Sequence, residues 1–214
     1  QNKAAESHNT AVGYNAGGAV TSGDHNTIMG YGAFDDCIDA NYNTAIGSGS
    51  LSADCGNSNV AVGYNAGNAS TGAGSTFLGQ TAGQYPTSAD YCTFVGHQAG
   101  LGISGTRLTG NENVAVGHNA GVNLQGTATQ NTLVGAYVGD GITSGDLNVM
   151  FGYNLDTNSA AADGNIVIGS NIAGAGGNTV RIGMSSGNAT LNLDGSDTSW
   201  AAASDARLKK DVAD

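Results

Sequence analysis

The chain repeats one short pattern of apolar and polar residues along most of its length. The first copy reads Asn-Thr-Ala-Val-Gly-Tyr-Asn-Ala-Gly over residues 9–17, and near-copies recur as far as residue 187, separated by polar loops. One glycine marks each copy, and successive marker glycines are 14 to 21 residues apart, most often 16 or 17. They are Gly13, Gly30, Gly47, Gly63, Gly79, Gly96, Gly117, Gly135, Gly152, Gly169 and Gly183. Such periodicity predicts a solenoid whose insertions fall in loops.

The residues before each marker glycine predict a β-strand. The third residue before the glycine is β-branched in every copy, and β-branched residues favour strands. A period of about 17 residues has room for two short strands and two turns. The expected fold is therefore all-β: a parallel β-roll or β-helix of eleven coils over residues 9–187. Residues 1–8 form a lead-in, 188–203 a closing strand or cap, and 204–214 the start of a separate C-terminal segment.

Both faces of this strand are apolar. The residue directly before the glycine is always large and is expected to line the core inside the coil: Val12, Met29, Ile46, Val62, Leu78, Val95, Val116, Val134, Phe151 and Ile168. The preceding residue points to the other face and is expected to contact another subunit: Ala11, Ile28, Ala45, Phe77, Phe94, Leu133 and Met150. Strands that are apolar on both faces are buried on both, so the pattern predicts a thin rod that associates with copies of itself. Twofold and threefold assemblies would both supply this burial.

Asparagine begins most copies, at Asn9, Asn26, Asn43, Asn59, Asn113, Asn131, Asn148 and Asn165. One interpretation is an amide ladder in which each side chain hydrogen-bonds to the next coil. The alternative is that asparagine only suits the turn before the strand.

Composition excludes several classes of protein. Glycine is 36 of 214 residues without a three-residue period, which excludes collagen. Hydrophobic residues are 39% and charged residues only 11%, which disfavours disorder. A net charge of −11 argues against a nucleic-acid partner, and no apolar run is long enough for a membrane-inserted helix. The first residues show no signal peptide, and a chain that begins at Gln1 is expected to be a fragment.

No enzyme constellation or cofactor motif is recognisable, so we expect a protein without catalytic activity toward a substrate, without a cofactor and without a metal site. The residue after the marker glycine is the most ligand-like position, because it carries Tyr14, Tyr31, Tyr64, His97, His118 and Tyr153. These rings could bind a sugar or a receptor, or they could shield a subunit boundary. The acidic loop at residues 35–39 lacks a calcium-binding pattern and is expected to be solvated.

The three cysteines match no zinc-binding spacing. Cys37 and Cys55 follow successive marker glycines by seven and eight residues, so adjacent coils would bring their loops together. A disulfide between them is one prediction and two free thiols the other. Cys92 takes a position of the asparagine column and is expected to be buried and unpaired.

Two short patterns resemble known families. The Asn-[Thr/Val]-Ala-[Val/Ile]-Gly repeats are similar to those in heads of trimeric autotransporter adhesins and in phage tail fibres, which implies a homotrimer. Ser204-Asp205-Ala206-Arg207-Leu208-Lys209 resembles the opening of the C-terminal intramolecular chaperone of phage tail spikes. That resemblance implies self-cleavage between Ser204 and Asp205, with Ser204 as nucleophile and Lys209 as its activating base. Only ten residues follow Ser204, so this chain alone should not cleave; the alternative is a charged helical tail capped by Ser204.

The expected function is a structural and adhesive virion protein, the trimeric shaft or tip of a phage tail fibre that contacts a host receptor or glycan. A bacterial extracellular adhesin or self-assembling surface filament is the alternative. A polysaccharide-degrading tail spike is less favoured because the repeats lack clustered carboxylates. An ice-binding solenoid ranks below these, because the threonine column alternates with valine and is expected to face the core.

Overall fold

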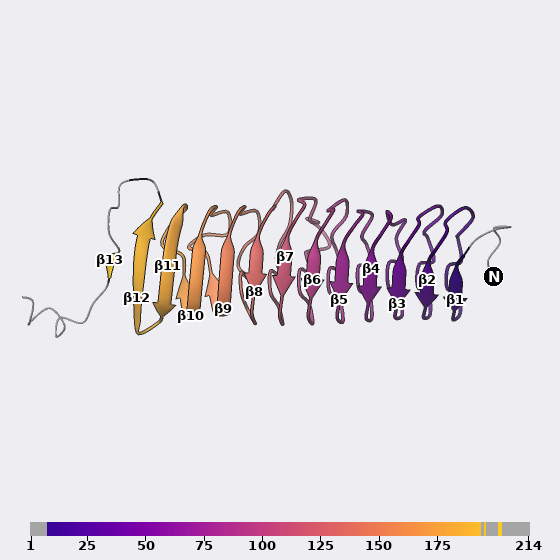
Figure 1. Ribbon diagram of the computed structural model, residues 1–214, viewed down its shortest axis with the longest axis horizontal. Helices are drawn as coiled ribbons and strands as arrows, with labels where there is room; N and C mark the ends of the chain where they lie inside the picture. Colours follow the sequence, from indigo (N-terminus) through magenta and orange to yellow (C-terminus); the bar gives the residue numbers. More distant parts are fainter. Residues whose placement is uncertain (1–7, 194, 196–200, 203–214) are drawn as a thin grey trace, which may run out of the picture.

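The computed structural model describes residues 8–193, 195 and 201–202. They form one sheet in which the strands follow one another in chain order, and the first eleven strands are parallel. Figure 1 shows the strands side by side along one wall of an elongated stack of coils. The fold is an all-β solenoid, as the repeat predicts. The described residues contain no helix, and so none that could cross a membrane.

The strands are β1 (Thr10–Val12), β2 (Thr27–Met29), β3 (Thr44–Ile46), β4 (Val60–Val62), β5 (Thr76–Leu78), β6 (Thr93–Val95), β7 (Val114–Val116), β8 (Thr132–Val134), β9 (Val149–Asp156), β10 (Ile166–Ala173), β11 (Thr179–Met184), β12 (Gly187–Asn192) and β13 (Ala201–Ala202).

Each of the first eight coils has one strand of three residues, so the expectation of two strands per coil is wrong there. The second half of the repeat turns instead of extending, because residues such as Asn15 (φ 54°) and Gly17 (φ 62°) are in the left-handed region. These turns still stack by backbone hydrogen bonds: Gly17 N–H donates to Ala33 O and Gly32 N–H to Tyr14 O, both at 2.9 Å. In β9 and β10 the strand runs through the glycine and reaches eight residues.

The marker glycine ends each short strand and lets neighbouring coils approach closely. Gly96 has φ +133°, and a Cβ built on it would lie 2.5 Å from the carbonyl oxygen of Gly117 in the next coil. A side chain there would clash with backbone and strain its own conformation. Glycine recurs at this position because adjacent coils come into contact through it.

The inner and outer faces of the strand are the reverse of those expected. The column expected to contact another subunit lies inside the coil: Ile28, Ala45, Phe77, Phe94, Leu133 and Met150 are buried, and Ala11 in the first coil is exposed. The column expected to form the core points outward: Val12, Met29, Leu78, Phe151 and Ile168 are exposed, and Ile46, Val62, Val95, Val116 and Val134 are half-buried. The β-branched column two residues earlier faces outward with it.

Confined volume explains this reversal. An inner column must vary in size, because it shares a narrow interior with the opposite wall. Phe94 fits inside because Gly100 lies against its ring, where a Cβ would approach Phe94 Cδ2 to 2.5 Å. The opposite wall carries small buried residues such as Ala99, and it carries Val138 and Leu155 nearer the C-terminal end. The outer column has no such limit, so its uniformly large residues were a sign of an open face.

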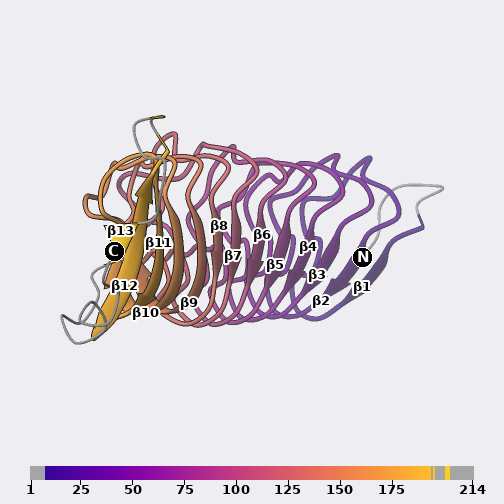
Figure 2. The ribbon, with the colours of Figure 1, turned by 60° about the vertical axis from the view of Figure 1, so that its left-hand side comes forward.

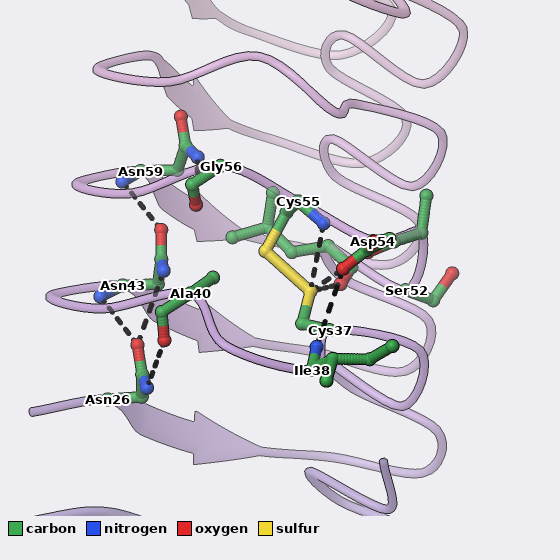
Figure 3. The surroundings of a disulfide bond; sticks show 12 residues. Asn26, Cys37, Ile38, Ala40, Asn43, Ser52, Asp54, Cys55, Gly56 and Asn59 are labelled. Carbon is green, nitrogen blue, oxygen red and sulfur yellow. Dashed lines mark hydrogen bonds between the residues drawn. A yellow bond between two sulfur atoms is a disulfide. The ribbon is translucent and has the colours of Figure 1, made fainter. Parts of the chain in front are cut away.

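The asparagine column forms the amide ladder. Asn43 donates from its backbone N–H (2.9 Å) and its Nδ2 (3.2 Å) to Oδ1 of Asn26, and Asn59 N–H donates to Oδ1 of Asn43 at 2.8 Å (Figure 3). Ser75 and Cys92 replace asparagine in two coils; Ser75 still accepts from Cys92 N–H at 3.0 Å. The ladder residues of the coils that follow the first are buried, so each amide satisfies polar groups that water cannot reach.

A second ladder, which was not predicted, runs two residues before the first and in the opposite direction. Asp24 N–H donates to Asn41 Oδ1 (2.8 Å), and Asn41 N–H donates to Asn57 Oδ1 (2.7 Å). Asp146 and Asp163 repeat the contact at 2.8 Å. Only an acceptor oxygen is needed, so aspartate and asparagine alternate freely in this column.

The repeat ends in a hairpin. β12 pairs with β11 in the antiparallel sense, and β13 pairs with β12. Figure 2 shows these strands at the C-terminal end of the coils. Much of the segment 188–203 that was expected to form a closing strand or cap, Trp200 included, lies outside the described residues.

Replacing Asn131 by alanine should lower the free energy of unfolding by at least about 2 kcal/mol. Each buried polar group left without a partner costs about 1–3 kcal/mol, and the substitution removes the partners of Gly145 O and of the Asn148 N–H. Urea unfolding followed by circular dichroism measures the change. Asn131→Ser should cost less, since Ser75 serves at this position, and exposed Asn158→Ala should be nearly neutral. Equal midpoints for N131A and N158A would contradict a structural role of the ladder.

Candidate functional site

The most extensive candidate site is the outer face of the sheet, defined here as three outward columns of the first ten coils. The first column is Thr10, Thr27, Thr44, Val60, Thr76, Thr93, Val114, Thr132, Val149 and Ile166. The second is the apolar column that begins at Val12 and ends at Ile168, and the third is the residue after each marker glycine. Side chains at these alternate positions share one side of the strand, as β9 shows by including Val149, Phe151 and Tyr153.

The central column of this face is apolar and open in the single chain. Val12 is 53% exposed and Phe151, near the other end, is 42% exposed. Monomeric proteins rarely leave a contiguous apolar strip along their whole length in water. The face therefore has the character of a surface that another molecule covers.

The outer face also carries no formal charge. None of its three columns contains Asp, Glu, Lys or Arg, although the chain has a net charge of −11. Most acidic residues that the structure describes lie in the loops, as Asp35, Asp54 and Asp140 do. Two copies of this face would meet without the repulsion that their loops would produce.

The rings of the third column stack on one another along the rod. The Tyr14 and Tyr31 ring centroids are 5.4 Å apart with 11° between their planes, and those of His97 and His118 are 5.2 Å apart with 16°. Tyr137, one residue farther along its coil, contacts His118 and Tyr153 edge to face. Stacked rings cover one another's faces and present edges outward, which favours shielding of a boundary over sugar stacking. Tyr64 lies between Ser48 and Gln80 in this column.

The disulfide joins Cys37 and Cys55, one of the two alternatives left by their spacing. Their Cα atoms are 5.5 Å apart, and both residues are buried in neighbouring coils (Figure 3). Cys92 is a free, buried thiol, and burial raises its pKa to about 11. The bond closes a loop between two coils and restricts the unfolded chain.

The structure brings together a cluster of titratable side chains that the sequence reasoning did not identify. His8, Asp24 and His25 meet where the chain enters the second coil. The 17-residue spacing of the two histidines, which equals the repeat period, was the signal for it. Ser204, Asp205 and Lys209, implied by resemblance to act in self-cleavage, lie outside the described residues.

Comparisons with protein-family models, with curated proteins and with solved structures found no match.

The cysteine assignment predicts a definite pattern of thiol reactivity. The unreduced chain should weigh two hydrogens less than the reduced chain. When folded and unreduced it should take up no alkyl group, and after denaturation without reduction it should take up one, on Cys92. The buried Cys92 thiol is protonated at neutral pH and only the thiolate reacts. Mass spectrometry after alkylation measures this, and uptake of three groups by the denatured, unreduced chain would show that no disulfide forms.

Proposed function

We propose that this chain is a structural and adhesive fibre protein whose copies associate as a homotrimer through the outer face. The observation that carries the proposal is an apolar, uncharged strip along the length of a rod that is otherwise acidic. The partner is a second and third copy of the same chain, because copies present the same columns at the same spacing and can match coil by coil.

The size of the face supports this partner. Ten coils have nine spacings of about 4.8 Å, so the strip is about 43 Å long, and five residues of about 3.3 Å make it about 17 Å wide. The resulting area, about 730 Å², is close to the surface of about 800 Å² that each partner contributes to a standard stable protein interface. The resemblance of the repeats to trimeric adhesin heads and tail fibres favours an assembly of three copies over one of two.

Within this proposal the rod is the shaft or tip of a phage tail fibre, and its exposed loops contact a host receptor or glycan. Stacked coils give stiffness, and the loops vary in length without disturbing the stack. The chaperone-like residues 204–209 favour a virion over a bacterial adhesin or filament. The disulfide suits any of these extracellular settings.

The outward threonines bear on a second candidate. The reason given against an ice-binding face, that the threonine column faces the core, is wrong, because Thr10 and Thr27 are exposed. The column nevertheless turns to Val149 and Ile166 toward the C-terminal end, and the apolar column beside it is continuous. A face of this composition favours protein contact over ordered water.

Native mass spectrometry of the full chain tests the proposal. We expect about 63 kDa, three times the chain mass of 21.1 kDa. Val95→Lys with Val116→Lys, on adjacent coils of the outer face, should yield monomers with unchanged circular dichroism, because buried unpaired charges oppose association. Thr127→Lys with Ser144→Lys adds the same charge on exposed loop positions and should remain trimeric.

A wild-type chain that stays monomeric at micromolar concentrations would overturn the proposal. A monomer that also shows thermal hysteresis would favour the ice-binding alternative instead.

A further inference from the structure

A cluster of two imidazoles and one carboxylate lies at the turn before the strand. His8 and His25 each precede a ladder asparagine, Asn9 and Asn26, so they occupy the same position in successive coils. Their rings stack with centroids 4.5 Å apart and 25° between planes. The turn at His25 is left-handed (φ 57°).

Asp24 is held in place by the backbone of both histidines. Its Oδ1 accepts the N–H of His25 at 2.7 Å and the N–H of His8, while its own N–H donates to Asn41 Oδ1 at 2.8 Å. The bond to Asn41 is a contact of the second ladder. The carboxylate is therefore positioned by the fold and not by the two imidazoles alone.

The nitrogen atoms of both rings face this carboxylate. Nδ1 of His8 lies 3.2 Å from Asp24 Oδ1, and Nδ1 of His25 lies 3.0 Å from Asp24 Oδ2. One potential metal-ligating atom from each of the three residues lies within 4.8 Å of the other two. Among the described residues, this is the group of His, Cys, Asp and Glu side chains that is close enough to hold a metal ion. The side chains are 70%, 32% and 46% exposed for His8, Asp24 and His25, so a hydrated ion can reach them.

We propose that His8, Asp24 and His25 bind a divalent transition-metal ion, with Zn²⁺ the best match. Zn²⁺ takes imidazole nitrogen at about 2.0–2.1 Å and carboxylate oxygen at about 2.0–2.2 Å, and it accepts three protein ligands with water as the fourth. Ca²⁺ and Mg²⁺ fit poorly, because they prefer oxygen ligands alone. The acidic chain adds a general attraction for cations.

The backbone holds the carboxylate in its ionised form. Hydrogen bonds from the backbone N–H groups, His8 first, lower the pKa of Asp24. The site would fasten the residues that enter the first coil onto the second coil, independently of the outer face.

The chain offers matched substitutions for the test. Asp24→Asn removes the carboxylate but keeps the ladder acceptor, since Asn41 occupies the same position one coil later. His25→Tyr removes a ligand but keeps a stacking ring, since Tyr42 occupies the same position and stacks on His25 at 5.1 Å. His97→Tyr and His118→Tyr are the controls, because that pair stacks at 5.2 Å on the outer face, away from this cluster.

The experiment adds Zn²⁺ alone to the chelator-treated full chain and measures binding by calorimetry. We expect one ion per chain. Removing a residue that only hydrogen-bonds to a metal-ligating side chain already lowers metal affinity by about 10–100-fold. D24N and H25Y remove a ligating group, so each should weaken Zn²⁺ binding at least that much. H97Y and H118Y should leave Zn²⁺ affinity unchanged. Thermal melts without metal check that every variant folds.

Imidazole NMR of the wild-type chain gives a readout that needs no variant. Zn²⁺ should shift the His8 and His25 resonances and leave those of His97 and His118 in place. No uptake by the wild-type chain, wild-type affinity in D24N or H25Y, or shifts confined to His97 and His118 would each overturn the proposal. In those cases the contacts of Asp24 with the two histidines only hold the turn together.

Discussion

Parallel stacking in register is the constraint on which the rest of the structure depends. Each strand pairs with the next so that equivalent repeat positions lie above one another, as Ile28 lies beside Ala45 and Phe77 beside Phe94. Any residue type that recurs in the sequence therefore becomes a continuous column in space. The amide ladders, the ring stacks, the inner core and the apolar strip are all columns of this kind.

The same constraint explains how much the sequence alone could predict. A column is visible as a recurring residue, so the parallel coils, the Asn26–Asn43–Asn59 ladder and the proximity of Cys37 and Cys55 could be expected from the period. Which side a column faces could not be read in the same way. Ile28 and Met29 are equally apolar, and only the volume left by the opposite wall decides that Ile28 points inward.

Two further features depend on backbone geometry that cannot be predicted from the residue types. The second half of the repeat looked long enough for a strand, but left-handed residues such as Asn65 and Gly67 make it a turn. The second ladder mixes aspartate with asparagine, so it has no single recurring letter. For the same reason the cluster around Asp24 emerged only from the structure, and Ser204 with its neighbours remains a prediction.

The reversal of the two faces strengthens the physical case for association. Had Ala45 and Ala61 faced outward, the strip would have been shallow and varied in shape. The residues that do face outward, Ile46 and Val62 among them, are all large and apolar, and they project from a continuous parallel sheet. A continuous, uncharged strip is suited to contact with an identical strip, and the loops remain free for other partners.

The most direct test of this association compares the oxidation by peroxide of two native methionines in the full chain. Met29 lies on the outer face and is 48% exposed in the single chain, whereas Met150 is buried inside the coils. If copies cover the outer face, Met29 should be oxidised nearly as slowly as Met150. Oxidation of Met29 at the rate of a freely exposed methionine, with Met150 protected, would show that the face is open to water and would contradict the association.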